Sequence, residues 1–427
     1  MRVTKPLVKP NVAEPISEQM AVDLYGEHFQ ASVSRIENFY SCPYSHFISY
    51  GLKLKERQEF KLETFAMGDL FHDAIRRILS EKDGLMSKDS TFQDCMNKAA
   101  DTVNAIIKNF SYQILQSSAR YDYIKKKLIK IVGRTLYALL QQHHITQFKP
   151  IAHEKSFGMK GLKSGTDEEG HIEGLKVKLK NNREMTIRGQ IDRIDGYRDG
   201  SDVYLRVIDY KSSKRDLNLT EVYNGISLQL LTYLEVASQN AIELVKDSEL
   251  VTNLQELESI IVKSAGMFYF HVHNPLLTVA DYSDVSLLEE ERLKQYKLKG
   301  YALEDVDVAL AMDETLEPST TSKIVPVGLT KDSKFSGRSS SVLDEEKMFT
   351  LKRFVPKKLQ QAGDKIYEGC TDINPYRLGN KKACTYCEYK AICQFDTAEP
   401  TNSYNEIKAI DKKEIHEKFK QVVNDHE

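Results

Sequence analysis

The sequence predicts an α/β protein in which a helical first third leads into a β-rich core. Before residue 145 apolar residues recur at helical spacing, in the segments 63–82, 92–116 and 122–145. After it they alternate with polar residues, as in half-buried strands, in the segments 150–157, 172–180, 185–196 and 203–211. A third observation is the cluster of cysteines near residue 390, which indicates a bound metal close to the chain's end.

Composition narrows the class of protein. The chain has 427 residues, 41% of them hydrophobic, which is enough for a large core in one or two domains. It contains no run of 18 apolar residues, and its first residues lack the apolar core of a signal peptide, so we expect a soluble cytoplasmic protein without membrane contact. A net charge of −2 argues against a generic polycation but leaves room for local basic stripes.

The order of these patterns suggests a division of the chain. Residues 1–30 contain prolines and mixed charges and are expected to form a linker or arm. A helix is expected from Ser34, capped by that serine with Glu37 and interrupted near Cys42-Pro43. The predicted parts of the remaining domain, 31–427, are a helical part 31–145, a core 146–300, a mobile insertion 301–341, a helix and cysteine segment 342–396, and a tail 397–427.

A predicted hairpin in the core brings two acids together. Strands 187–196 and 203–211 flank a turn centred on Gly200-Ser201, which places Asp192 opposite Asp209 on the same face. Directly opposed Cβ atoms lie roughly 4.5–5.5 Å apart, where like charges are destabilising unless a cation lies between them. Mg²⁺ prefers such carboxylate oxygens. Lys211, one pleat further along, would then hold an attacking water or stabilise charge on a phosphate.

The spacing of these three residues does not by itself exclude a plainer interpretation. Charged residues are also common at the solvent-exposed end of a hairpin, so both interpretations stay open on the residues alone. We expect Asp195 and Asp199 to be turn residues. Glu154 could add a third acid, but an exposed strand glutamate is the simpler expectation.

The motifs in their order resemble RecB-type PD-(D/E)xK nucleases. GQIDRID followed by VIDYKSS carries the two acids and the lysine, and SLQLLTYLEVA contains Gln229 and Tyr233 in the family's Q-x₃-Y pattern. MGDLFHDAI places His72 in the family's G-x₂-hydrophobic-His pattern. The resemblance implies a restriction-endonuclease-like mixed sheet flanked by helices and a Mg²⁺- or Mn²⁺-dependent deoxyribonuclease.

The resemblance also implies roles for single residues. His72, Asp192, Asp209 and the backbone carbonyl of Tyr210 would hold one or two metal ions, and Lys211 would orient the attacking water. Gln229 and Tyr233 would contact the DNA strand beside the cut, with the tyrosine stacking on a base.

Four of the six cysteines have ligand spacing. Cys384, Cys387 and Cys393 form C-x₂-C-x₅-C, and Cys42 lies far upstream in YSCPYSHF. Zinc and a [4Fe–4S] cluster are both chemically allowed, and one pair with two single cysteines favours iron–sulfur. The other two, Cys95 and Cys370, have no partner at ligand spacing and are expected to be buried or incidental thiols.

The cysteines extend the resemblance to the nuclease region of the AddB (RexB) family, from about Ala31 to Asp396. That family implies a [4Fe–4S] staple made of one cysteine before the nuclease fold and three after it. It implies an AddA-type helicase–nuclease partner in double-strand break repair, and exonuclease cleavage of single-stranded DNA on the 5′-terminated strand, in the cytoplasm at the nucleoid. No G-x₄-G-K-[ST] phosphate loop or helicase-like region occurs in this sequence, so ATP hydrolysis by this chain is not expected.

Two other functions remain open at this point. The same residues occur in stand-alone RecB-type iron–sulfur exonucleases of CRISPR spacer acquisition, which are usually shorter. A decayed nuclease fold that only binds DNA is the non-enzymatic alternative, and the intact set of Asp192, Asp209 and Lys211 argues against it.

Overall fold

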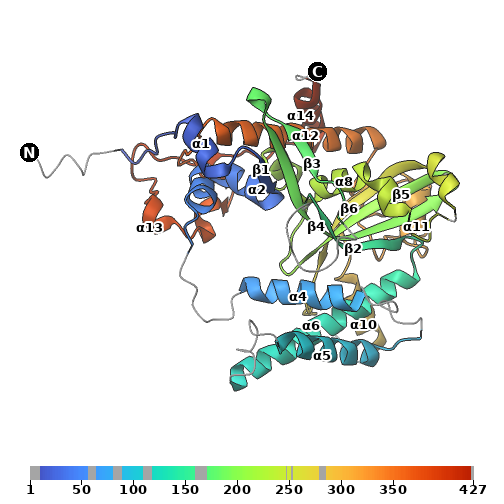
Figure 1. Ribbon diagram of the computed structural model, residues 1–427. Helices are drawn as coiled ribbons and strands as arrows, with labels where there is room; N and C mark the ends of the chain where they lie inside the picture. Colours follow the sequence, from blue (N-terminus) through green and yellow to red (C-terminus); the bar gives the residue numbers. More distant parts are fainter. Residues whose placement is uncertain are drawn as a thin grey trace, which may run out of the picture.

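The fold is known from a computed structural model, which describes residues 10–55, 64–79, 89–108, 118–158, 171–246, 248–251, 253–277 and 285–424. A twisted sheet crosses the molecule, with α12 and α14 above it and α4, α5 and α6 below it (Figure 1). The α/β class and the mixed sheet flanked by helices are therefore confirmed. No helix among the described residues has the length and apolar character needed to cross a membrane.

The main sheet is mixed and is organised around one long strand. Its path runs β1-β4-β5-β6-β7-β8, and β2 and β3 also pair with β4. The pairs β1–β4, β5–β6 and β7–β8 are parallel, and the others are antiparallel. The strands are β1 (Phe29–Ser32), β2 (Lys149–Phe157), β3 (Leu175–Lys178), β4 (Glu184–Asp199), β5 (Asp202–Lys211), β6 (Ile261–His271), β7 (Lys299–Leu303) and β8 (Val342–Leu343). A small second sheet contains β9 (Tyr376–Leu378), β10 (Lys381–Lys382) and β11 (Asn405–Glu406).

Two helical layers cover the two faces of the main sheet with separate apolar cores. Along β5, Val207 packs into the first core, which includes α2, α8, α12 and α14. Ile208 packs into the second core, which includes α4, α5, α6 and α11. This alternation is the period-2 pattern of a strand buried on both faces. The helices are α1 (Glu18–Tyr25), α2 (Val33–Ser41), α3 (Pro43–His46), α4 (Thr64–Leu79), α5 (Phe92–Ile107), α6 (Ala119–His144), α7 (Leu219–Tyr223), α8 (Gln229–Gln239), α9 (Ala241–Val245), α10 (Val285–Lys294), α11 (Val306–Met312), α12 (Glu345–Tyr367), α13 (Lys390–Cys393) and α14 (Lys412–Asn424).

The β4–β5 hairpin has the predicted register. Its pairs run from Arg193–Ile208 to Asp199–Asp202, so the turn is centred between Gly200 and Ser201. Gly200 has a φ of 58°, the left-handed conformation that glycine adopts without steric cost. Asp195 is a correction, because it lies in the strand and not in the turn. It is fully buried and forms ion pairs of 2.6 Å with Arg193 and 2.9 Å with Arg206.

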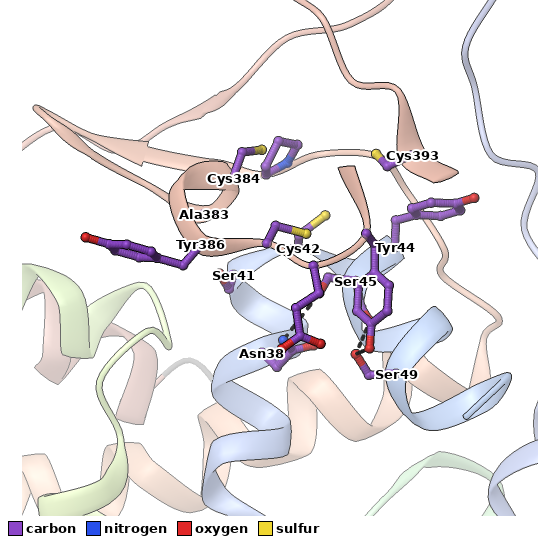
Figure 2. Close-up of a pocket in the computed structure, with 14 residues that line it drawn as sticks. Asn38, Ser41, Cys42, Tyr44, Ser45, Ser49, Ala383, Cys384, Tyr386 and Cys393 are labelled. Atoms are coloured by element: carbon purple, nitrogen blue, oxygen red, sulfur yellow. Dashed lines mark hydrogen bonds between the residues drawn. The ribbon is translucent and has the colours of Figure 1, made fainter. Parts of the chain in front are cut away.

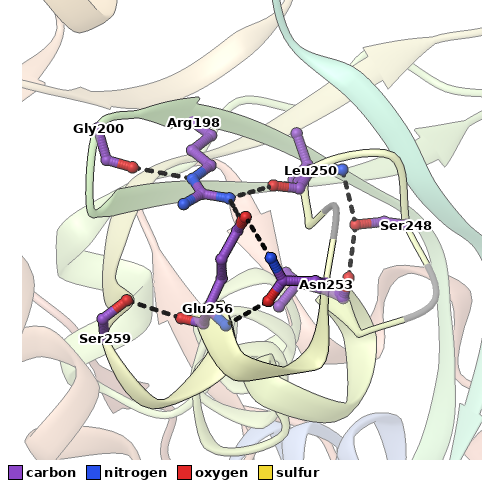
Figure 3. A network of polar contacts seen from close by, with 8 residues as sticks. Arg198, Gly200, Ser248, Leu250, Asn253, Glu256 and Ser259 are labelled. Atoms are coloured by element: carbon purple, nitrogen blue, oxygen red, sulfur yellow. Dashed lines mark hydrogen bonds and ion pairs between the residues drawn. The ribbon is translucent and has the colours of Figure 1, made fainter.

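The turn of this hairpin is tied to the loop that precedes β6. The Arg198 guanidinium donates to the carbonyl oxygens of Gly200 (2.8 Å) and Leu250 (2.9 Å) and forms an ion pair with Glu256 (Figure 3). Asn253 in turn donates to the Glu256 carboxylate and accepts from its amide. These bonds fix the turn end of the hairpin. They therefore support the β4–β5 register, which places Asp192 opposite Asp209 at the other end.

The described residues of the expected N-terminal arm are folded and include a helix and the start of a strand. Helix α1 packs into the first core through Ala21, and β1 extends the main sheet; residues 1–9 lie outside the described part. The helix predicted from Ser34 is α2, but its cap is Ser32, whose hydroxyl accepts from the Arg35 amide. The predicted break holds, because α2 ends at Ser41 and α3 begins at Pro43.

Two later expectations are also corrected. The segment 301–341, predicted as a mobile insertion, contains most of β7 and all of α11 and buries Val325 and Val327 in the second core. The many serines and threonines of this segment are typical of a loop sequence, but several of them stabilise tight turns. The Ser322 hydroxyl, for example, donates to the buried Asp313 carboxylate. The predicted tail contains α14, which buries Phe419 against Phe354 of α12 at 4.7 Å between ring centroids.

Candidate active site

Carboxylates from three neighbouring strands form a row across the main sheet. The β2–β4 pairs on either side of Glu154 place it opposite Asp192. The β4–β5 register places Asp209 opposite Asp192 on the other flank. Directly opposed side chains on one face are close neighbours, so the three acids form a row with Asp192 between Glu154 and Asp209.

Helix α4 adds a histidine to this row. Nδ1 of His72 lies 3.5 Å from Oδ2 of Asp192. One ligand atom from each of His72, Glu154 and Asp192 lies within 4.8 Å of the other two. Carboxylate oxygens and an imidazole nitrogen suit Mg²⁺ or Mn²⁺, so the donor set fits a divalent cation.

Burial makes the charges in this row costly. Asp192 is 8% exposed and Asp209 1%. Burial, and then the charges of Asp209 and Glu154, raise the pKa of Asp192 well above its ordinary value. Burial also raises the pKa of Asp209, with Lys211 opposing the shift, and raises that of Glu154 to about 7. Burial lowers the pKa of His72, which favours the neutral imidazole that binds metals.

Asp209 is paired with the lysine of the motif. Nζ of Lys211 lies 2.5 Å from Oδ2 of Asp209, and this contact opposes the rise that burial causes in the pKa of Asp209. The neighbouring Asp192 has His72 and Glu154 beside it. A divalent cation held by these residues would offset the repulsion that Asp192 experiences from the other two acids.

The predicted lysine and the Q-x₃-Y residues form a chain of contacts leading away from Asp209. Nζ of Lys211 donates to Oε1 of Gln229 at 2.9 Å, and Nε2 of Gln229 donates to the hydroxyl of Tyr233 at 2.9 Å. These residues come from β5 and α8, which pack against each other. The structure therefore brings together the residues that the sequence motifs singled out.

The predicted stacking of Tyr233 on a DNA base is corrected by its burial. This side chain is 7% exposed and packs edge-on against Phe157, with ring centroids 5.9 Å apart. Its hydroxyl holds Gln229, which holds Lys211. Tyr233 thus positions the lysine and has no free ring face for a base.

Tyr210 contributes through its backbone. Its amide donates to Oδ2 of Asp192 at 2.7 Å, which fixes that carboxylate toward His72. The Tyr210 side chain points into the second core, and the centre of its ring lies 6.3 Å from that of the His72 ring. A metal-binding role for the Tyr210 carbonyl stays a prediction.

Glu154 lies in the carboxylate row, although its place in the sequence predicted a plain exposed strand glutamate. It is only half exposed, and its φ of 47° lies in the left-handed region that residues other than glycine rarely adopt. Such strained backbone occurs most often at functional sites. The sequence places Glu154 in a strand, but it does not show which residue of β4 lies opposite. That depends on the β2–β4 register, which no local motif encodes.

Glu37 is a second residue whose role was missed. Its carboxylate accepts hydrogen bonds from the backbone amides of Leu228 (2.7 Å) and Gln229 (3.0 Å), at the start of α8. Burial raises its pKa, and Arg215 opposes the shift. Glu37 therefore fixes the end of α8 that carries Gln229, and it belongs to α2, the helix that ends next to Cys42.

The four selected cysteines line one cavity of about 300 Å³. Figure 2 shows Cys42 at the end of α2 facing the C-terminal segment that carries Cys384 and Cys393. Burial raises the pKa of the Cys42 thiol to about 11, although backbone amides of Ser45 and Asn374 point at its sulfur and oppose the shift. Four soft thiol ligands around a cavity of this size fit a metal or a metal–sulfur cluster.

The remaining cysteines lie elsewhere, as expected. Cys95 is fully buried in the second core. Cys370 lies beside the first core, and its sulfur contacts Oδ2 of Asp372 at 3.5 Å. Neither lines the cavity of the other four.

Comparisons with known proteins agree with this geometry. Residues 30–394 match the PD-(D/E)XK nuclease superfamily. The chain is 43% identical over 99% of its length to a Lysinibacillus sphaericus protein named as a subunit of an ATP-dependent helicase/deoxyribonuclease, and 37% identical to the Bacillus mycoides and Bacillus anthracis proteins of the same name. It spans about a third of the length of these relatives (35% and 34% for the first two). The match extends over most of the described strands and helices, and the chain belongs to the PD-(D/E)XK nuclease superfamily.

Proposed function

We propose that the chain is a metal-dependent deoxyribonuclease that cuts DNA as the nuclease part of an AddAB-type helicase–nuclease. The observation that carries the proposal is the meeting of Asp192, Asp209 and Lys211 on two paired strands, with the acids buried and in need of a cation. The names of the relatives support a DNA substrate and a role within a larger enzyme complex.

The residues have distinct tasks in this proposal. His72, Glu154, Asp192 and Asp209 would hold one or two Mg²⁺ or Mn²⁺ ions, together with the Tyr210 carbonyl. A bound metal lowers the pKa of a water and neutralises charge on the scissile phosphate. Lys211, at the end of the carboxylate row, would orient the attacking water.

Two supporting residues keep this lysine in place. Gln229 accepts from Lys211, and Tyr233 fixes Gln229, so the ammonium has a defined direction before DNA binds. Such positioning lowers the reorganisation needed at the moment of reaction.

The finer parts of the proposal concern substrate and partner. We infer exonuclease action on single-stranded DNA, on the 5′-terminated strand, in a complex with an AddA-type helicase–nuclease during double-strand break repair. The cytoplasm, at the nucleoid, is the proposed location. The relatives' names, which combine a helicase with a deoxyribonuclease, support the DNA substrate and the larger complex, whereas the strand, its polarity and the location follow from the family resemblance alone.

Cys42, Cys384, Cys387 and Cys393 would hold a [4Fe–4S] cluster that fastens α2 to the C-terminal segment. The shared cavity and the soft thiol donors support the assignment. A Cys₄ zinc site is the alternative, and iron and sulfide analysis of anaerobically purified protein distinguishes the two.

A cleavage assay tests the proposed function. The purified chain is incubated with labelled single-stranded DNA and, in parallel, with plasmid, in Mg²⁺ or in EDTA. Cleavage in Mg²⁺ that EDTA stops, and that Asp209→Ala lacks, is the expected result. DNA binding without cleavage, alone or with an AddA-type partner, would favour the decayed DNA-binding module.

A further inference from the structure

A strongly basic pocket lies directly beside the candidate active site. It has a volume of about 320 Å³ and opens next to Lys211. Six cationic side chains line it, along with two histidines: Lys211, Lys214, Arg215, Lys294, Lys297, Lys299, His271 and His273.

The sheet register makes this pocket a continuation of the catalytic row. In the β5–β6 ladder Asp209 pairs with Tyr269 and Lys211 pairs with His271. In the β6–β7 ladder Tyr269 pairs with Lys299. Paired residues of neighbouring strands share a face. The row of acids on β2, β4 and β5 therefore continues through the uncharged Tyr269 of β6 to the cation Lys299 of β7, and Lys211 lies one pleat from Asp209 along β5.

Most of these cations have little to neutralise them within the described part of the chain. Lys211 pairs with Asp209 and Lys294 with Glu291, whereas the salt bridges of the described residues include none to Lys214, Lys297 or Lys299. Burial, and then the charge of Lys299, lower the pKa of Lys297, and the charge of Asp313 opposes this shift.

Arg215 is also held in the pocket without a salt bridge among the described residues. Its guanidinium lies 5.6 Å from the centre of the Tyr269 ring, and the charges of Glu37, Asp209 and Glu221 act on it from a distance. The surplus of positive charge in this pocket calls for an anion with several charges.

We propose that this pocket binds backbone phosphates of the DNA strand adjacent to the scissile phosphate. The cations are spread over β5, β7 and the end of α10, which suits a chain of phosphates better than a single phosphate group. The inference rests on the proposed nuclease function, because the pocket would hold the DNA strand that is cut, on the Lys211 side of the metal site.

The test removes two pocket lysines that take no part in the metal site. The 427-residue variant Lys214→Gln/Lys299→Gln is compared with wild type for binding of fluorescent dT₁₂ by anisotropy, in EDTA, over a series of NaCl concentrations. We expect affinity at about 0.1 M NaCl to fall on the order of tenfold, and the slope of log K against log salt to decrease by about 1.4, or roughly 0.7 for each lost phosphate contact.

The matched control is Lys176→Gln/Lys178→Gln, which also removes two exposed lysines, but from β3. Its affinity and salt slope should equal those of wild type. Melting temperature and Mn²⁺ binding are measured for both variants, and both should keep wild-type values. In Mg²⁺ the pocket variant should show a higher KM with kcat retained at saturating dT₁₂.

The outcomes separate this inference from the proposed function. Equal affinities and salt slopes for the pocket variant, control and wild type, with cleavage intact, would overturn the pocket assignment alone. Pocket-dependent binding by a wild type that never cuts would overturn the nuclease proposal alone. Competition by dTMP as effective as that by dT₁₂ would show a single-phosphate site and reject the assignment to a DNA strand.

Discussion

The carboxylate row and the cysteine cavity are both suited to metals, but they are built differently. Asp192 and Asp209 lie on paired strands in the middle of the sheet, where ladder hydrogen bonds set their separation. Cys384 and Cys393 lie on a short 3₁₀ turn and on α13, outside the main sheet, and are half exposed. The first site is formed by paired strands of the sheet, whereas the second joins two distant segments, which the proposed cluster would fasten to each other.

Electrostatics reinforces this difference. Without a cation, burial raises the pKa values of the three acids, repulsion from its neighbours adds to the rise for Asp192, and the strand ladders still hold the acids in place. Burial raises the pKa of Cys42, Cys384 and Cys393, so these thiols are neutral and do not repel one another. Loss of the proposed cluster from the cysteine cavity would therefore remove a connection and add no repulsion, and its effect should be on stability.

Helix α2 connects the two regions. It carries Glu37, which holds the start of α8, and it ends next to Cys42. A change at the cysteine cavity that displaces α2 should reach Lys211 through Gln229.

The largest expected effect is that of Asp209→Ala on cleavage. Losing one acid of the row removes a metal ligand, so cleavage should fall on the order of 10³-fold. The melting temperature in EDTA should stay the same or rise, because a buried repulsion is relieved. Gel assays and thermal melts measure both, and wild-type cleavage by the mutant would contradict the site.

Lys211→Ala is the matched control for that variant. It should also lose cleavage but keep Mn²⁺ binding, because an ammonium group has no lone pair to donate. Equal loss of Mn²⁺ binding in Lys211→Ala and Asp192→Ala would show a structural role for the lysine.

Cys42→Ala and Cys387→Ala test the other region. Each should lose iron and destabilise the chain by about 4 kcal/mol, the scale of a cross-link that closes a long loop. Iron content and a protease time course are measured, with DNA binding expected to fall as well. Cys95→Ala and Cys370→Ala are controls that should keep their iron, and full iron in Cys42→Ala would contradict the assigned ligand.

Glu37→Ala tests the connection between the regions. Two amides at the start of α8 would lose their acceptor, and kcat should fall about tenfold as Gln229 and Lys211 lose their positions. Glu37→Gln keeps an acceptor oxygen and should restore most of kcat. Mn²⁺ affinity should not change in either variant. A lower melting temperature with kcat unchanged would limit Glu37 to a structural role.

The smallest expected effect is a pH dependence of stability in EDTA. Glu154 has a folded-state pKa of about 7, above its ordinary value of 4.5. The folded state therefore binds the proton more tightly, and stability decreases as pH rises between these two values. The melting temperature should rise when pH falls from about 7.5 to about 5.5, and Glu154→Gln should weaken this slope. An identical slope in the mutant would show that other groups cause it.

Some of this molecule could be predicted from sequence because its signals are local. The helical periods of α4, α5 and α6 and the alternation in β4 and β5 depend on neighbours a few residues away. The pairing of Asp192 with Asp209 followed from a two-residue turn, since a short hairpin allows one register. The Q-x₃-Y spacing likewise placed Gln229 and Tyr233 on one helix face.

Only the tertiary structure decided the rest. Glu154 joins the site through the β2–β4 register, Glu37 through the packing of α2 on α8, and Lys299 through the β6–β7 ladder. The burial of Tyr233, which removes its predicted contact with DNA, also depends on a distant residue, Phe157. These contacts join segments far apart in the chain, and their geometry is set by how the layers pack, which no local pattern of residues encodes.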